Sequence, residues 1–108
     1  MKDKIHIVLA CSAGMSTSLL VKKMQESAEK EGRACEIKAI PIAAIDQTVE
    51  EERVDILLLG PQVRFKKAEL SQELAPKGIK VDVIDMSDYG LLKGDKVLHA
   101  ALAELGEA

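Results

Sequence analysis

The sequence predicts an α/β fold in which a four-stranded parallel sheet is covered by helices on both faces. Three observations lead to this prediction. Short apolar or β-branched runs alternate four times with segments whose apolar residues recur at helical spacing. Two of the runs are apolar throughout, as is typical of central strands, whereas the other two alternate between apolar and polar residues, as is typical of edge strands. Right-handed crossovers then favour the strand order 2-1-3-4.

The first strand is predicted over residues 5–10, a β-branched run with almost no polar side chains. A helix should follow from near Ser16 or Thr17, because apolar residues then recur every three or four positions. These positions are Leu20, Val21, Met24 and Ala28. Gly32 suits the left-handed conformation that ends such a helix. Residues 34–40 alternate in polarity and predict the second strand.

The second half of the chain repeats the pattern. Pro41 breaks the second strand and opens a short helix. The apolar face of that helix is marked by Ile42, Ile45 and Val49. Residues 55–60 form an almost continuous apolar run, which predicts a third strand buried on both faces, and Gly60-Pro61-Gln62 ends it.

A third helix is predicted from near Gln62. Its inward positions are Val63, Lys67, Leu70 and Leu74. Residues 79–85 alternate again and predict the fourth strand, and residues 87–94 are predicted to form a loop. Asp95 is expected to cap a last helix. The inward residues of that helix are Leu98, Ala101, Leu102 and Leu105.

The loop Cys11-Ser-Ala-Gly-Met-Ser-Thr-Ser18 joins the first strand to the first helix. Backbone N–H groups converge in such a turn, and the helix adds roughly half a positive charge behind them, so the loop is suited to an anion. A cysteine nucleophile stands beside this anion site. In the order 2-1-3-4, Cys11 and Gly60-Pro61-Gln62 meet in the crevice where open α/β sheets bind ligands. A tight turn with an incidental cysteine is the structural alternative.

Composition and charge exclude several classes of function. The 108 residues suffice for one domain, residues 1–108, and a net charge of −3 argues against nucleic acid as a partner. The two cysteines lack metal-ligand spacing, so we expect no metal and two free thiols in a reducing, cytoplasmic setting. The motifs G-x-x-x-x-G-K-[ST] and G-x-G-x-x-G are absent, and no cofactor is predicted.

The loop after the first strand has the spacing of the cysteine-phosphatase anion loop, Cys-x5-Arg-[ST], without its cation. Thr17 stands at the arginine position and Ser18 at the hydroxyl position. In a phosphatase the arginine neutralises phosphoryl oxygens, but neutral N–H and hydroxyl donors can still hold a phosphoryl group on sulfur. The residues therefore favour a phosphoryl carrier. A low-molecular-weight cysteine phosphatase or arsenate-reductase relative, and a non-catalytic binding module, are the alternatives.

Three segments of the chain together resemble the IIB component of the sugar phosphotransferase system, lactose/cellobiose (diacetylchitobiose) type. They are Ile-His-Ile-Val-Leu-Ala-Cys-Ser-Ala-Gly-Met-Ser-Thr-Ser-Leu-Leu-Val and, later in the chain, Leu-Leu-Leu-Gly-Pro-Gln and Val-Ile-Asp…Tyr-Gly. The resemblance extends over essentially the whole chain. It implies a phosphotransferase whose Cys11 accepts a phosphoryl group from a phosphohistidine of the IIA protein. The group then passes to a sugar held by the membrane permease IIC. The implied phosphate cradle comprises Ser12, Ala13, Gly14, Met15, Ser16 and Thr17.

The same resemblance favours the cellobiose or chitobiose branch, because lactose-type IIB domains are typically fused to IIC. A monomer is expected.

Two residues near the crevice are candidate partner contacts. Gln62 can donate to a phosphate or a partner, or cap the helix that follows it. Phe65 points away from the predicted core, so either the helix begins later or an aromatic ring is exposed as a partner contact.

The remaining chemically capable side chains have structural explanations. His6 lies within the first strand and His99 lies on the last helix, one position off its apolar face. Cys35 alternates with polar neighbours and fits an inward position as a small hydrophobic residue. Tyr89 is expected to pack within its loop. None of these four is predicted to take part in catalysis.

Overall fold

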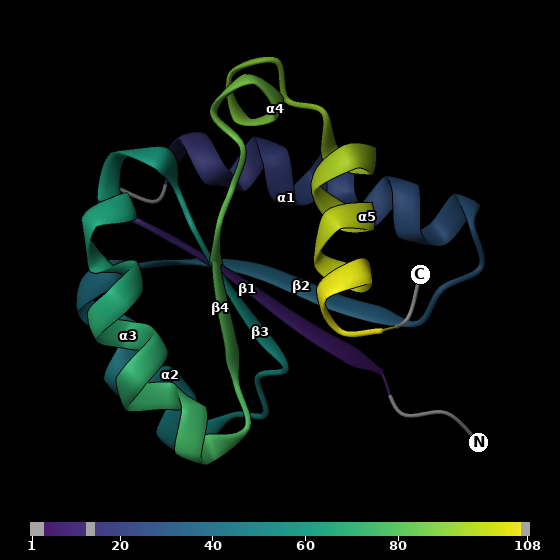
Figure 1. The fold of residues 1–108 in the computed structure, drawn as a ribbon. Coiled ribbons are helices and arrows are strands. Elements are labelled where there is room, and N and C mark those ends of the chain that lie inside the picture. The colour runs from purple at the N-terminus through teal and green to yellow at the C-terminus, as the bar shows by residue number, and fades with distance from the viewer. Residues whose placement is uncertain (1–3, 13–14, 107–108) are drawn as a thin grey trace.

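The computed structural model describes residues 4–12 and 15–106, in which strands and helices alternate along the chain (Figure 1). The strands are β1 (Ile5–Cys11), β2 (Cys35–Pro41), β3 (Ile56–Leu59) and β4 (Lys80–Val83). The α-helices are α1 (Met15–Lys30), α2 (Ile45–Glu51), α3 (Lys67–Leu74), α4 (Met86–Gly90) and α5 (Gly94–Glu104). Three short 3₁₀ helices are η1 (Ile42–Ala44), η2 (Pro61–Lys66) and η3 (Ala75–Lys77).

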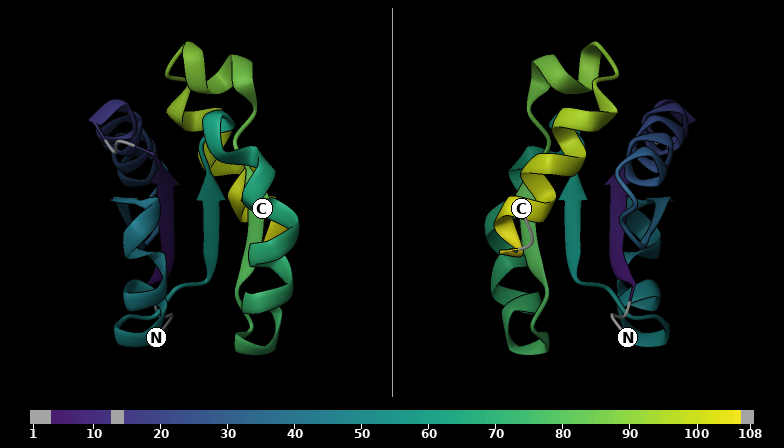
Figure 2. Two further views of the ribbon diagram at one scale, coloured as in Figure 1. Left: turned by 90° about the vertical axis from the view of Figure 1, so that its left-hand side faces the viewer. Right: turned by 90° about the vertical axis from the view of Figure 1, so that its right-hand side faces the viewer.

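The four strands form one parallel sheet in the order β2-β1-β3-β4, which confirms the predicted order. Ile7 of β1 pairs with Ile37 of β2 on one side and with Ile56 of β3 on the other. All of β3 and the last five residues of β1 are buried, as expected of apolar strands at the centre of a sheet. In Figure 2 the strands run in the same direction, and α4 lies at their carboxyl ends.

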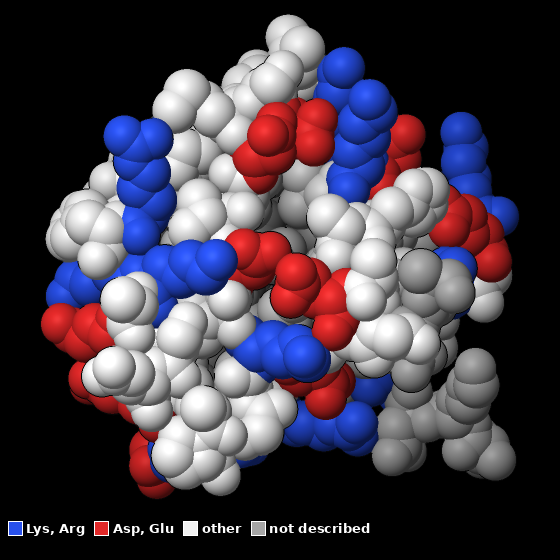
Figure 3. Space-filling model, in the orientation of Figure 1, with Lys and Arg blue, Asp and Glu red and all other residues white. Residues whose placement is uncertain are grey.

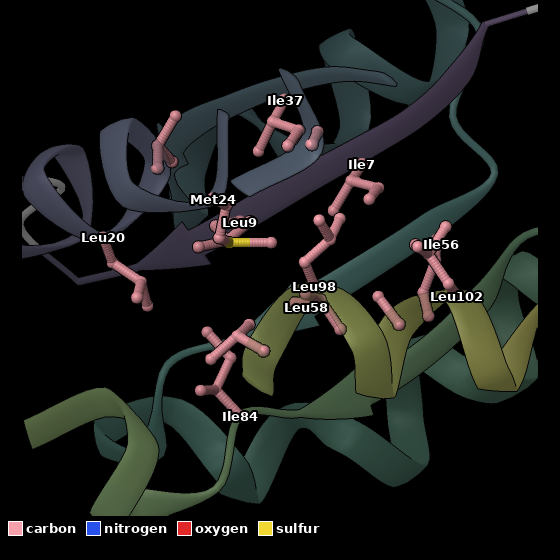
Figure 4. Close-up of a cluster of buried hydrophobic side chains, with 14 residues drawn as sticks. Ile7, Leu9, Leu20, Met24, Ile37, Ile56, Leu58, Ile84, Leu98 and Leu102 are labelled. Atoms are coloured by element: carbon pink, nitrogen blue, oxygen red, sulfur yellow. The ribbon is translucent and has the colours of Figure 1, made fainter. Parts of the chain in front are cut away.

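Helices cover both faces of the sheet, as predicted (Figure 2). On one face α1 and α5 pack against alternate residues of the strands, and Figure 4 shows this layer in close-up. Its large buried side chains include Ile7, Leu9, Leu20, Met24, Leu98 and Leu102. On the other face α2 and α3 pack against the intervening residues of the same strands. That layer includes Val8, Ile45, Leu57, Leu59, Leu70 and Leu74.

The predicted loop over residues 87–94 is wrong in part, because α4 occupies Met86–Gly90. A local cap at the N-terminus of α4 explains why this helix forms. The Asp85 carboxylate accepts hydrogen bonds from the backbone N–H groups of Ser87 (3.0 Å) and Asp88 (3.1 Å). These bonds satisfy donors that a short helix otherwise leaves without partners.

The predicted cap of the last helix is also wrong. Lys93 occupies the N-cap position of α5 and makes no side-chain cap hydrogen bond, and Gly94 is the first helical residue. Asp95 therefore lies inside the first turn. There its charge stabilises the positive end of the helix without capping it.

The segment after β3 also begins differently from the prediction. The 3₁₀ helix η2 bends at Val63, where φ is −120° and ψ is 24°, and α3 starts only at Lys67. Lys67 is consequently not an inward residue: its half-exposed side chain pairs with Asp82 at 3.4 Å. The α-helix starts later than expected, and Phe65 is 74% exposed. Its role as a partner contact stays a prediction.

Charges of both signs are interspersed over the face seen in Figure 3. This distribution agrees with the small net charge of the sequence. Across residues 4–12 and 15–106, no helix combines the length and the apolar composition that crossing a membrane requires.

Gly94 lies where α5 crosses α1, and it has no room for a side chain. A Cβ atom at this residue would lie 2.6 Å from the carbonyl carbon and the Cβ of Lys23, and 2.7 Å from the backbone nitrogen of Met24. These distances are far below van der Waals contact, and two of the three atoms belong to the helix backbone. The close approach of the two helices therefore depends on glycine at this position.

Gly94→Ala is expected to lower the free energy of unfolding by about 1–3 kcal/mol, the usual cost of overpacking a core. Gly90→Ala is the matched control, because no atom lies within 4 Å of its Cβ position and its φ is not positive. Denaturant unfolding of both variants measures the difference. Equal stability of the two variants would contradict this account of the helix crossing.

Candidate functional site

Cys11 is the last residue of β1 and lies at the carboxyl edge of the sheet, where only 3% of it is exposed. It is in register with Pro41 of β2, and the residue that follows it, Ser12, is exposed. From here the chain continues into α1, whose first turn contains no acidic residue. A thiol thus stands between a central strand and the positive end of a 16-residue helix, a setting that favours a bound anion.

Thr17 provides the side chain that contacts the thiol. It lies in the first turn of α1, is fully buried, and places its Oγ1 3.4 Å from the Sγ of Cys11. Its burial also bears on the phosphatase comparison, because Thr17 stands at the position of the phosphatase arginine. A guanidinium group buried to the same extent would carry a large desolvation cost. Here a hydroxyl, and not a cation, stands beside the sulfur.

The end of β3 forms the other side of the site, as the strand order predicts. The backbone N–H of Gly60 donates to the carbonyl oxygen of Ala10 at 2.9 Å. The point where a Cβ of Gly60 would lie is 3.2 Å from the Cβ of Cys11 and 3.0 Å from the Oε1 of Gln62. Gln62 is exposed, so its carboxamide is open to solvent next to the thiol residue. Cys11 and Gly60 therefore lie side by side at the carboxyl edge of the sheet, as the strand order predicts.

The other predicted cradle residues are described in part. Met15 and Ser16 belong to the first turn of α1, which begins one residue before the predicted start, and their side chains lie outside the description. Ala13 and Gly14 lie outside the described residues. The phosphate cradle over residues 12–17 therefore stays a prediction.

Four exposed large apolar residues lie in segments that follow strands of the sheet, and the sequence patterns identified only one of them. The exposed fractions are 74% for Phe65, 49% for Leu19, 62% for Met86 and 64% for Leu91. Leu19 follows Thr17 by half a turn of α1, and the other three lie in segments that follow β3 and β4. Met86 is the first residue of α4 and Leu91 is its C-cap, so the missed signal was the pair of apolar residues at the two ends of this short helix.

The two histidines have structural partners away from the thiol, as predicted. The Nδ1 of His6 lies 3.2 Å from the Oε2 of Glu36, on the neighbouring edge strand. The Nε2 of His99 lies 2.6 Å from the Oε2 of Glu31. This hydrogen bond lowers the pKa of the Glu31 carboxyl and links α5 to the residue that follows α1. Tyr89 is partly buried against the core, in agreement with a packing role.

Cys35 differs from Cys11 in position and environment. It begins β2 in register with Ile5, at the amino edge of the sheet, opposite the edge that carries Cys11. The two cysteines are not joined in a disulfide. Partial burial raises the pKa of the Cys35 thiol, so this thiol is mostly protonated at neutral pH.

Comparisons with known proteins agree with this geometry. Residues 6–100 match the family model described as PTS system, lactose/cellobiose specific IIB subunit. The galactose-specific EIIB component of Lactococcus lactis subsp. cremoris and the cellobiose-specific EIIB component of L. lactis subsp. lactis are each 51% identical over 104 residues, which cover 94% of this chain and 95% of each relative. The oligo-beta-mannoside-specific EIIB component of Bacillus subtilis is 47% identical and covers 90% of this chain and 92% of its own.

Solved structures show the same fold. The cellobiose-specific phosphotransferase IIB component of Borrelia burgdorferi is 38% identical, with a TM-score of 0.76 over 95% of this chain and 93% of that one. The lactose-specific IIB domain of Streptococcus pneumoniae has a TM-score of 0.83 at 18% identity, over 94% of this chain and 97% of that one.

The raised pKa of Cys35 predicts slow alkylation. In a Cys11→Ser variant Cys35 is the only cysteine, since the sequence has two. We expect iodoacetamide to modify it several-fold more slowly at pH 7 in the folded protein than in urea, because the folded thiol is less often a thiolate. The difference should narrow as the pH rises towards the raised pKa. Equal rates at pH 7 would contradict the prediction.

Proposed function

Because the chain belongs to the lactose/cellobiose-specific IIB family of the sugar phosphotransferase system, we propose that Cys11 is the residue on which this phosphotransferase carries its phosphoryl group. One observation supports this assignment above the others. The Cys11 Sγ stands at the carboxyl end of β1, 3.4 Å from a hydroxyl in the first turn of α1. Cys35 begins β2 and lies at the other edge of the sheet.

The proposed cycle has two displacement steps at phosphorus. In the first, the Cys11 thiolate attacks the phosphorus of a phosphohistidine on IIA: the S–P bond forms, the N–P bond breaks, and its electron pair stays on the imidazole. In the second, a hydroxyl oxygen of the sugar attacks the same phosphorus. The O–P bond forms, the S–P bond breaks, the thiolate is regenerated, and the hydroxyl proton passes to a base or to solvent.

The proposed cradle holds the phosphoryl oxygens with neutral donors. It consists of Ser12, Ala13, Gly14, Met15, Ser16 and Thr17. The N-terminal N–H groups of α1 favour the negative charge, and the Thr17 hydroxyl can donate to the sulfur or to a phosphoryl oxygen. A cradle without arginine suits a residue that must hold the group until the acceptor arrives. Family membership favours this carrier role over the phosphatase and binding-module alternatives.

The proposed partners are a IIA donor protein, the IIC permease and the sugar that IIC holds. We infer that IIA docks on the apolar rim formed by Leu19, Phe65, Met86 and Leu91, with Gln62 beside the thiol. These residues are exposed and lie in segments that follow β1, β3 and β4, the strands whose carboxyl ends form the edge that carries Cys11. Exposed aromatic and apolar side chains beside a reactive group are typical of a protein interface.

Several broader expectations remain part of the proposal. The relatives are named for galactose, cellobiose and oligo-beta-mannoside at similar identity, which supports a sugar choice made mainly by the permease. We propose that residues 1–108 act as one domain and as a monomer, in the cytoplasm, where the thiols stay reduced. No metal, cofactor or nucleic acid enters the proposed cycle.

Cys11→Ser is expected to abolish phosphoryl acceptance from phosphorylated IIA, whereas Cys35→Ser should retain it within about two-fold, because only Cys11 stands at a helix N-terminus. The measurement is incorporation of labelled phosphate into each purified variant after circular dichroism has shown that it folds. Comparable loss in both folded variants would refute the assignment of the carrier residue.

Phe65→Ala is expected to weaken IIA binding roughly ten-fold or more, as is common when an exposed aromatic anchor is truncated. His99→Ala, an exposed change on α5, is the control and should leave the affinity unchanged. NMR titration with IIA gives both the affinity and the surface. Shift changes confined to the amino edge of the sheet, near Cys35, would exclude docking on the rim.

A further inference from the structure

Gly60 has an ordinary backbone conformation, so chain flexibility does not explain the glycine. Its φ is −61° and its ψ is 152°, values that any L-residue adopts readily. Gly32 and Gly78 differ, with φ values of 68° and 76° that favour glycine. What distinguishes Gly60 is therefore the space around its Cα.

That space is filled by the thiol residue. A Cβ on Gly60 would lie 3.2 Å from the Cβ of Cys11, 3.0 Å from the Oε1 of Gln62 and 3.7 Å from the carbonyl oxygen of Ala10. Carbon atoms in favourable contact are about 3.5–4.0 Å apart, so the first distance requires a displacement of a few tenths of an ångström. The contact with Gln62 is easily relieved, because that side chain is exposed and flexible.

Cys11 cannot move as easily. It is buried at the end of a central strand, in register with Pro41 on one side. On the other side the Gly60 N–H is bonded to the carbonyl oxygen of Ala10 at 2.9 Å, which fixes the two chain segments against each other. A side chain at position 60 would therefore act mainly on the Cys11 side chain.

We propose that Gly60 is a positioning residue for Cys11: the bare Cα at the end of β3 leaves the room in which the Cys11 side chain keeps its place beside Thr17. The proposal rests on the carrier role of Cys11. The Sγ stands 3.4 Å from the Thr17 Oγ1, and a shift of the Cys11 Cβ changes that contact and the direction from which the sulfur meets phosphorus. Group transfer is sensitive to such shifts, since a misplacement of 1 Å can reduce a rate about 100-fold.

Gly60→Ala tests this directly, with Gly90→Ala as the matched control, since the Cβ position of Gly90 is free of neighbours within 4 Å. We expect folded Gly60→Ala to show a kcat for phosphoryl acceptance from IIA about 10–100-fold below wild type, with the KM for IIA unchanged. Gly90→Ala should behave as wild type. The double variant Gly60→Ala/Gln62→Ala should keep the lowered kcat, because the contact of the new Cβ with Gln62 is not the one that displaces Cys11.

A second readout separates this proposal from the carrier assignment. Iodoacetamide alkylation of Cys11, measured against Cys35 in the same molecule, requires no phosphoryl transfer. The ratio of the Cys11 to the Cys35 alkylation rate should change in Gly60→Ala and stay constant in Gly90→Ala. This holds even if phosphoryl transfer proves to use another residue. A wild-type kcat and alkylation ratio in folded Gly60→Ala, or full recovery in the double variant, would overturn the positioning role.

A further variant covers failure to fold. If Gly60→Ala is unfolded, Cys11→Gly in the same chain should restore folding, because it removes the Cβ that lies 3.2 Å away. Continued unfolding of that double variant would show that Cys11 is not the group that Gly60 accommodates, and would overturn the proposal.

Discussion

The parallel pairing of β1 with β3 is the constraint on which the site depends. In this pairing Ala10 stands opposite Leu59, and the N–H of Gly60 continues the ladder on the carbonyl oxygen of Ala10. The chain departs in opposite directions from these two strands, to α1 on one face and to α3 on the other. Cys11, the last residue of β1, consequently lies at the carboxyl edge where the two chain segments diverge.

The two apolar layers hold this edge in place. Leu20 and Met24 anchor α1 one and two turns beyond Thr17, so the helix terminus that faces Cys11 is fixed by the core (Figure 4). Gly94 lets α5 pack directly on the backbone of α1 and completes that support.

Hydrophobic patterning predicted the strand order and the position of Cys11, because burial on one or two faces leaves a direct trace in the sequence. Features that depend on single contacts are not visible in the hydrophobic pattern and were not predicted. Examples are the cap that Asp85 gives to α4 and the start of α5 at Gly94, ahead of the predicted cap Asp95. The full burial of Thr17 and the room left by Gly60 arise between segments distant in sequence, so no local pattern could indicate them.

The chemical identity of the phosphorylated residue tests the account most directly. The full chain is incubated with phosphorylated IIA, and the product is examined by ³¹P NMR and by mass mapping of its peptides. The account predicts one phosphoryl group bound through sulfur, on the peptide that contains Cys11. A phosphoryl group bound through nitrogen on His6 or His99, or found on the peptide that contains Cys35, would contradict it.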